Sequence, residues 1–422
     1  MSWSKFSFRL RELLGQVWLR VLVFAVMGIV TAIAALLLRP FIPDSLTDWL
    51  GADAVGSVLE IIATSMLSVT IFALSTLVSA WAAAEQNSSP RVLPLIVSDG
   101  RSQTVLSTFI GAFVFSLVGI IMLRTGVYGG SGRVVVFAAT VVVVLLIIGT
   151  LLQWIEVLSD LGQIRDSLDR LEEATTRAIR NRQKEPYLGG RLWVGDPPAG
   201  AEAIFGDKVG RVRHVDVSTL SQLAEEFELT LYLDGIPGTL VHAARPLLFV
   251  TGLDQDDEEK RKPILNSLNN AFTIGQAPSF EQDPLHGITA LSEVAQRALS
   301  PGINDPGTAQ DVIVRLVRVL SDTGAVAEDH EIERQRLFVR EITADDMMQA
   351  AFAPIIRDSA DVYEVQISLL DGLRALSKLQ PQFYAESAGK LAAFILHYVE
   401  RSEMPQPQVE KIRDLSGNLV SD

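Results

Sequence analysis

The sequence predicts a membrane α-helical protein with four transmembrane helices, joined to a cytosolic α+β domain with a small β-rich module and a helical C-terminal region. Two observations lead to this fold class. The 422-residue chain is 48% hydrophobic, and its long uncharged stretches lie within the first 155 positions. Residues 1–155 carry a net charge of +2 in a chain of −14, so residues 156–422 carry −16. The chain therefore divides into an apolar part and a charged part.

Four apolar stretches predict the transmembrane helices. About 20 helical residues cross the hydrocarbon core, so runs of this length are membrane-span candidates. The stretches cover residues 21–38, 56–84, 105–123 and 134–155. Ala32-Ile-Ala34 resembles a signal-peptide cleavage site, but the apolar run continues through Leu36–Leu38 and three further spans follow. We therefore expect a four-span transmembrane domain over residues 1–155.

The basic residues predict the orientation. Lysine and arginine concentrate in the N-terminal segment, around Arg91 and Arg101 in the second loop, and after the fourth span. Cytoplasmic loops carry an excess of these residues. We therefore expect a multi-pass protein of the bacterial inner (cytoplasmic) membrane, with both termini in the cytoplasm and the lipid bilayer as a partner.

The second span carries an unusual polar stripe. Helical spacing places its members on one face, with an acid near the outer end of the span. Two interpretations remain open: small and hydroxyl residues that let helices pack closely in lipid, or a polar pathway through the membrane. The helix from Gly56 to Asn87 would be about 48 Å long and so would extend beyond the hydrocarbon core. The pore-lining candidates are Glu60, Ser65, Ser68, Phe72, Ser75 and Ser79.

Residues 156–422 divide into three parts by composition. For residues 156–185 we expect a helical stalk, because the pattern from Leu158 to Gln183 is that of one amphipathic helix. For residues 186–257 we expect a β-rich module. Its strands lie in GRVRHVDV and LTLYLDG, and Thr219 caps a short helix. Residues 258–422 predict a mainly helical domain, in which Thr343 and Asp346 form a capping box.

The segment RALSPGINDP interrupts this helical region. Ser300, Pro301 and Gly302 predict the end of one helix, and Asp305 followed by Pro306 predicts the start of the next. Asp283-Pro284 predicts a helix start by the same logic. We expect a structural turn here; a ligand or interface site, and acid–base chemistry, are the alternatives. The residues that could converge at one end of this helix pair are Asp283, His286, Asn304 and Asp305, with Gln282 beside them.

Motifs for catalysis are absent from the sequence. It has no G-x-x-x-x-G-K-[ST], G-x-G-x-x-G, G-x-S-x-G or H-E-x-x-H, and its five histidines lack ligand spacing. It has no cysteine, which excludes disulfides, thiolate zinc sites and thiol catalysis. The acidic region also lacks the basic patches that bind phosphate. We expect no enzyme, no metal, no cofactor and no nucleic-acid partner.

Several of these motifs resemble a bacterial family of predicted membrane proteins of unknown function. They are ALSPGINDP with the following Thr308-Ala309, the Ser89-Pro90-Arg91 loop after a serine-rich span, GRVRHVD at 210–216, and Pro237-Gly238. The resemblance covers almost the whole chain. It implies the architecture and makes the matching residues signature or interface candidates, but it implies no activity.

These observations favour a homo-oligomeric ion channel or transport pore, with a cytosolic domain for assembly or gating. Four spans are few for a monomeric transporter, so oligomerisation is the natural way to enclose a pathway for an ion or small solute. A membrane-tethered sensor or scaffold, whose cytosolic domain binds a ligand or partner protein, is the alternative. An enzyme acting on lipid comes third, because we find no acid–base group facing the bilayer other than Glu60.

Overall fold

The computed structural model describes residues 22–23, 26–27, 29–31 and 33–34, and residues 52–421 except 88, 98, 126–128, 161–162, 255–257 and 327–329. The chain forms two compact units. We call residues 6–86 and 93–166 the helical unit, and residues 87–92 and 167–422 the α+β unit. Half of the first predicted span, residues 21–38, lies outside the described residues.

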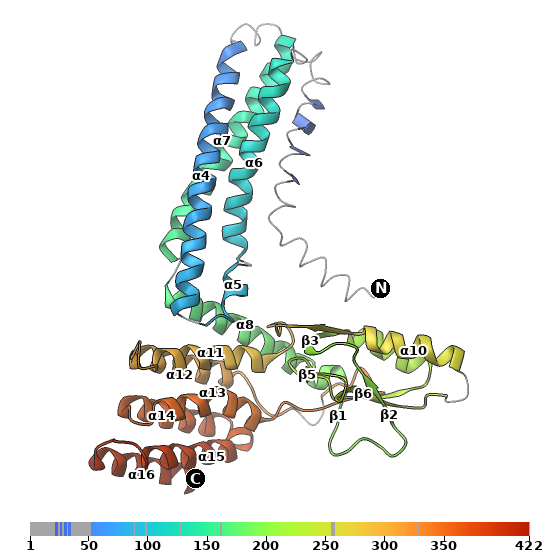
Figure 1. The fold of residues 1–422 in the computed structure, drawn as a ribbon, viewed down its shortest axis with the longest axis vertical. Coiled ribbons are helices and arrows are strands. Elements are labelled where there is room, and N and C mark those ends of the chain that lie inside the picture. Colours follow the sequence, from blue (N-terminus) through green and yellow to red (C-terminus); the bar gives the residue numbers. More distant parts are fainter. Residues whose placement is uncertain are drawn as a thin grey trace. The chain divides into compact units, whose positions relative to one another are not determined.

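The helical unit contains three helices that are long and apolar enough to cross a membrane. They are α4 (Ala52–Asn87), α6 (Gly100–Arg124) and α7 (Gly129–Asp160), with the short α5 (Leu93–Val97) after the second loop (Figure 1). They contain the second, third and fourth predicted spans. The protein is therefore helical with three candidate spans among the described residues.

Helix α6 is the most enclosed of the three. In the most apolar stretch of α6, 56% of the residues are buried, whereas the corresponding share is 28% in α4 and in α7. Gly119 permits its close approach to α4, because a Cβ there would lie 3.0 Å from Cδ1 of Leu59. Small residues allow this type of helix contact in lipid. The outward faces of α4 and α7 consequently remain uncovered by the described residues.

Helix α8 (Ile164–Lys184) begins the α+β unit and corrects the predicted stalk. The single amphipathic helix expected from Leu158 to Gln183 is wrong, since α7 ends at Asp160 and α8 starts at Ile164. The physical reason is that the two helices bury different surfaces. The sequence of α7 is apolar on every face, whereas α8 buries one stripe that includes Leu168, Leu171 and Ile179. Helix α8 is thus an integral part of the unit.

Six helices form three stacked layers in this unit (Figure 1). Proline begins three of them, where its missing N–H costs nothing, and Thr343 and Asp346 form the predicted capping box of a fourth. The layers are α11 (Pro284–Ala298) with α12 (Pro306–Ser321), α13 (Ala344–Asp358) with α14 (Tyr363–Leu379), and α15 (Pro381–Val399) with α16 (Gln406–Ser421).

Two small sheets form the rest of the α+β unit. The larger has the order β1 (Arg191–Leu192), β8 (Leu337–Val339), β4 (Thr230–Leu233), β6 (Pro246–Thr251) and β2 (Glu202–Phe205). The smaller has the order β5 (Leu240–Val241), β3 (Gly210–Val215) and β7 (Phe272–Gly275). The strands expected in GRVRHVDV and LTLYLDG are confirmed as β3 and β4. Strands β7 and β8 come from beyond residue 257, so both sheets draw on sequence from either side of that position.

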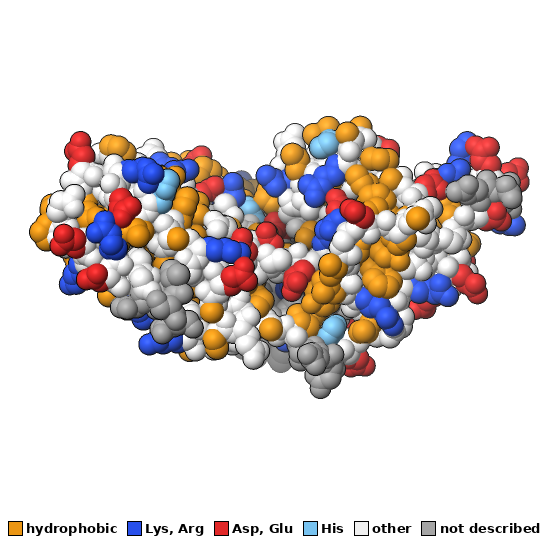
Figure 2. Space-filling view, turned by 90° about the horizontal axis from the view of Figure 1, so that it is seen from below, with side chains coloured by type: hydrophobic (Ala, Val, Ile, Leu, Met, Phe, Trp, Pro, Cys, Tyr) orange, Lys and Arg blue, Asp and Glu red, His pale blue; other side chains and the backbone are white. Residues whose placement is uncertain are grey.

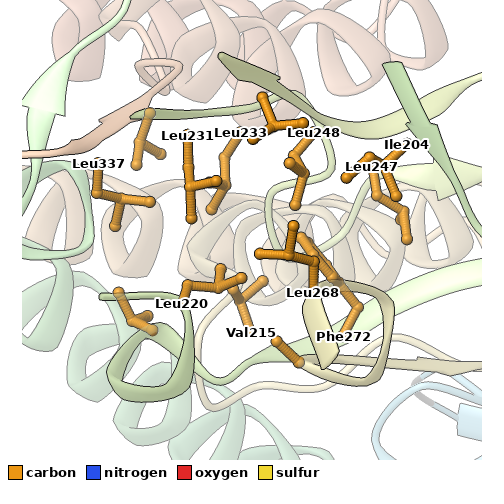
Figure 3. Close-up of a cluster of buried hydrophobic side chains, with 14 of the residues drawn as sticks. Ile204, Val215, Leu220, Leu231, Leu233, Leu247, Leu248, Leu268, Phe272 and Leu337 are labelled. Carbon is orange, nitrogen blue, oxygen red and sulfur yellow. The ribbon is translucent and has the colours of Figure 1, made fainter. Parts of the chain in front are cut away.

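A hydrophobic core joins the sheets to α9 (Val217–Glu226) and α10 (Glu258–Asn270). In Figure 3, Leu231, Leu233 and Leu248 of the larger sheet point towards Leu220 and Leu268 of these helices. The predicted Thr219 cap of α9 is wrong. Asp216 is the N-cap, because its carboxylate accepts from the backbone N–H of Thr219.

The opposite face of the larger sheet is aromatic. Trp193 contacts Tyr232 and Phe249 edge-on, with ring centroids 5.8 and 5.9 Å apart, and the Arg340 guanidinium lies 4.0 Å from the Trp193 ring centroid. Figure 2 shows hydrophobic side chains gathered over the strand-rich part of the unit, with acidic and basic side chains interspersed elsewhere on that face.

Candidate functional site

The candidate residues of the α+β unit, which are Gln282, Asp283, His286, Ser300, Pro301, Asn304, Asp305 and those of the Ser89–Arg91 loop, lie along α11. One group precedes its N-terminus, the Ser89–Arg91 loop contacts its middle, and another group follows its C-terminus. The expected convergence of Asp283 and His286 with Asn304 and Asp305 is therefore wrong. Helix α11 has 15 residues, which separate its ends by about 22 Å. The turn and the Asp–His pair are two separate places.

At the N-terminus, Asp283 caps α11 from a buried position. Its Oδ1 accepts from the backbone N–H of His286 at 3.1 Å. Burial raises the pKa of Asp283 to about 6, although hydrogen bonds from His286 and Leu285 oppose the shift. Gly238, in the predicted Pro-Gly turn, has φ +90°, and a Cβ there would overlap the Asp283 carboxylate. This turn requires glycine because it packs directly on the cap.

His286 is buried beside the cap and is held neutral. Its ring lies 4.4 Å from that of Phe280, centroid to centroid. Burial, with smaller contributions from the positive charges of Arg91 and Arg211, lowers the pKa of His286 to about 4. Gln282 accepts from the backbone N–H of Val215 at 2.9 Å and so anchors β3 to the start of α11. A neutral histidine and a hydrogen-bonded glutamine fit a structural junction.

In the middle of α11, Glu293 binds the loop that follows α4. The Ser89 hydroxyl donates to Oε2 of Glu293 at 2.9 Å, and Arg91 pairs with Oε1 at 2.9 Å. Ser89 is 2% exposed, and Pro90 lies between the two contacts. Both oxygens of one carboxylate are thus engaged by residues just beyond the end of α4. Sequence reasoning did not identify Glu293, since no motif marks a partner 200 residues away.

Glu293→Ala should release this loop. Hydrogen bonds to charged groups contribute about 1.5–3 kcal/mol each, so we expect amide exchange at residues 89, 91 and 92 to accelerate about tenfold or more. Hydrogen–deuterium exchange of the full chain in detergent measures this, with Glu386→Ala, at an exposed Lys390 pair, as the matched control. Unchanged protection of the loop would contradict the assignment.

After the C-terminus of α11, the backbone conformation of the turn explains why residue 304 is an asparagine. Its φ is +51°, a left-handed conformation that asparagine adopts more readily than other non-glycine residues. Its backbone N–H donates to the Ser300 carbonyl at 2.9 Å, and its side chain is exposed. The Ser300 hydroxyl donates to the Arg297 carbonyl. Asp305, which follows Asn304, caps α12: its Oδ1 accepts from the backbone N–H of Thr308 at 3.1 Å. The predicted helix stop and helix start are confirmed, with exposed Pro301 between them.

The backbone role of Asn304 makes glycine its best substitute. Asn304→Gly should leave the free energy of unfolding nearly unchanged, while Asn304→Ala should lower it by about 1 kcal/mol, because only glycine adopts φ +51° without strain. Thermal melting of both variants measures the difference. A larger loss for glycine than for alanine would show instead that the amide side chain itself is required.

On α4, the whole serine stripe is exposed. Leu59, Ile62, Met66, Ala73 and Leu77 form the buried face of this helix. Ser65, Ser68, Phe72, Ser75 and Ser79 lie on another face, and Phe72 is 62% exposed. The described helices therefore do not pack on the stripe. Two of its hydroxyls, those of Ser68 and Ser79, donate to backbone carbonyls one turn earlier.

Glu60, expected at the mouth of the stripe, is paired. Its Oε1 accepts from Arg124 at the end of α6, at 2.7 Å, and both side chains are exposed. Arg124 lies one residue beyond the third predicted span, residues 105–123, where no sequence motif marks it as a partner of Glu60. The described part of the chain holds no group of three His, Asp or Glu side chains that could bind a metal ion.

The fold defines an α-helical membrane protein whose spans are joined to an α+β region. The chain belongs to the predicted membrane protein family DUF2254, which it matches over residues 15–375. It is 25% identical over 287 residues to uncharacterised proteins of Mycobacterium bovis and Mycobacterium tuberculosis. The alignment covers 67% of this chain and 55% of each relative, so the chain spans about half the length of the curated relatives it matches. No solved structure matches.

Proposed function

We propose that the protein is a homo-oligomeric channel or transport pore of the bacterial inner membrane, with four spans, cytoplasmic termini and no catalytic activity. The α4 stripes of several copies line the pathway. The α+β unit lies in the cytoplasm, where it assembles or gates the pore.

The exposed polar stripe of α4 carries this proposal. A lipid-facing helix surface gains nothing from hydroxyl groups, whereas a water-filled pathway or a polar helix contact does. The stripe lies on a different face from the residues that pack on α6 and α7. Phe72 is its one large side chain, and a ring of such residues around an axis forms a hydrophobic constriction of the kind that gates by dewetting.

Two further features support an oligomer with a gate. Three or four spans in one copy leave α4 at the edge of the bundle, so its stripe needs other copies to enclose a pathway. The Glu293 contacts fix the loop directly after α4 to α11, which gives the α+β unit a mechanical connection to the pore-lining helix.

Ion flux in liposomes tests the proposal. We expect the purified protein to be an oligomer and to pass small ions, and Phe72→Ala to increase the flux because it removes the constriction. Ile71→Ala is the matched control: Ile71 neighbours Phe72 and is equally exposed, at 60% against 62%, but does not belong to the stripe. A monomeric protein without flux would contradict the proposal.

A further inference from the structure

A small cavity lies inside the α+β unit, beside the start of α11. Its volume is about 60 Å³. The end of α8, the turn η2 (Pro186–Gly189), the start of α11 and the start of α15 all contribute to its walls. Most of the lining is apolar, including Ile179, Ile342, Met347 and Phe383, and the polar groups are few. A pocket with mostly apolar walls and few polar groups is typical of small-molecule sites.

Arg182 is the unusual group in this lining. It follows Ala178 and Ile179 by one helical turn, so it lies on the buried face of α8. Its Nη1 atom is buried and has no hydrogen-bond partner among the described residues. Nη2 makes one long contact, 3.5 Å to the Arg340 carbonyl. Burial lowers the pKa of Arg182 to about 10, against the influence of Tyr187, Asp283 and Glu341, so the guanidinium stays charged at neutral pH.

An arginine with an unused buried donor needs an explanation. Burying a charge is costly unless the group is paired and hydrogen-bonded. The described chain places no carboxylate within ion-pairing distance of Arg182, although Arg315 and Arg334 elsewhere in the unit each have such partners. An apolar side chain would fill this position at lower cost. The free donor is therefore explained if a bound molecule supplies the acceptor.

The charges around the cavity limit the chemistry of that molecule. Glu341 also lines the cavity and is exposed at its rim, so the two charged groups of the site have opposite signs. A plain carboxylate would add an anion close to Glu341 and Asp283, and a plain amine would add a cation close to Arg182. A zwitterion satisfies both groups without a net charge. The small volume and apolar walls require a short aliphatic body.

We infer that this cavity binds a short aliphatic α-amino acid, whose carboxylate accepts from Nη1 of Arg182, whose ammonium group faces Glu341, and whose side chain packs on Met347 and Phe383. The site makes the α+β unit a sensor of amino-acid supply. This inference does not depend on a pore, because binding is measured without flux.

The test compares three matched probes by thermal shift and calorimetry of the full chain in detergent. L-Valine carries both charges, isovalerate lacks the ammonium group, and isobutylamine lacks the carboxylate. At a hundredfold excess over Kd, valine should raise the melting temperature by about 5–10 °C. Isovalerate and isobutylamine should raise it far less.

Two variants separate the site from a general effect. Arg182→Met should fold, since it removes a buried charge, and should no longer respond to valine. Arg180→Met, on the same helix at an exposed ion pair with Asp322, should keep the full response. The inference is overturned if alanine, valine and leucine all fail to shift the wild-type protein, if the shift persists in Arg182→Met, or if isovalerate is as effective as valine.

Discussion

Asp283→Asn should stabilise the protein at pH 7.5 and change little at pH 4. Asp283 is 5% exposed, and burial raises its pKa from 3.8 to about 6. Below pH 3.8 the carboxyl is protonated in both the folded and unfolded states. Between about pH 3.8 and 6 the unfolded state has lost the proton while the folded state still holds it, so the folded state loses stability as the pH rises through this range. The shift corresponds to about 3 kcal/mol at neutral pH. Asparagine caps a helix as well as aspartate does, so the cap itself should survive.

The pH profile of this variant gives a second readout. His286 has the opposite sign: its lowered pKa of about 4 contributes stability above its ordinary pKa of 6.5 that is lost as the pH falls towards 4. In the wild type the two trends oppose each other between pH 4 and 6. Asp283→Asn should remove one of them and leave a protein that loses stability on acidification.

Asp305→Asn is the matched control, because it also changes an Asp-Pro cap. Hydrogen bonds from Thr308 lower the pKa of Asp305, so its ionised form is stabilising and asparagine should weaken the protein at neutral pH. Thermal melting at pH 4 and pH 7.5 measures all three proteins. A loss of stability in Asp283→Asn at pH 7.5 would contradict this account of the cap.

Gly287→Ala should destabilise the protein by about 1–3 kcal/mol through overpacking. Alanine normally stabilises a helix interior relative to glycine by about 1 kcal/mol. In α11, however, a Cβ at position 287 would lie 2.8 Å from both Cβ and Cγ2 of Thr175 and would overlap its hydroxyl. Thr175 is fully buried on α8, so it has no room to move.

Gly417→Ala is the control for intrinsic helix propensity. Gly417 is inside α16, and nothing lies within 4 Å of a Cβ placed there, so this variant should be stabilised by roughly 0.5–1 kcal/mol. Thr175→Ala combined with Gly287→Ala should recover part of the loss, because it removes the hydroxyl and the methyl group. If Gly287→Ala and Gly417→Ala both stabilise the protein, α8 and α11 are not in close contact.

Local signals predicted much of this fold. The caps at Asp283, Asp305 and Thr343 could be predicted because a cap depends on residues within three positions of it. The α+β unit's strand partners could not, since β8 pairs in parallel with β4 more than 100 residues earlier. The length of α11 was available from the sequence, and it should have excluded the convergence of Asp283 with Asn304.

The candidate sites were harder to predict than the caps. In the sequence, Arg182 is one of several basic residues that follow the fourth predicted span. Its signal was the helical spacing from Leu171, Thr175 and Ala178, which places an arginine on the buried face of α8. The left-handed backbone of Asn304 had no signal beyond the residue type itself. Glu293 and Arg124 are recognisable only by their partners in space.

The most direct test of the central claim asks whether the α4 stripe faces water. The chain has no cysteine, so Ser68→Cys and Ser75→Cys each create a single thiol at nearly constant volume. Only the hydrated thiolate reacts with a membrane-impermeant thiosulfonate reagent. In liposomes both should react quickly, while Ile71→Cys and Val78→Cys, which are exposed on the same helix but outside the stripe, should be protected by lipid. Equal protection at all four positions would show that the stripe lines no water-filled pathway.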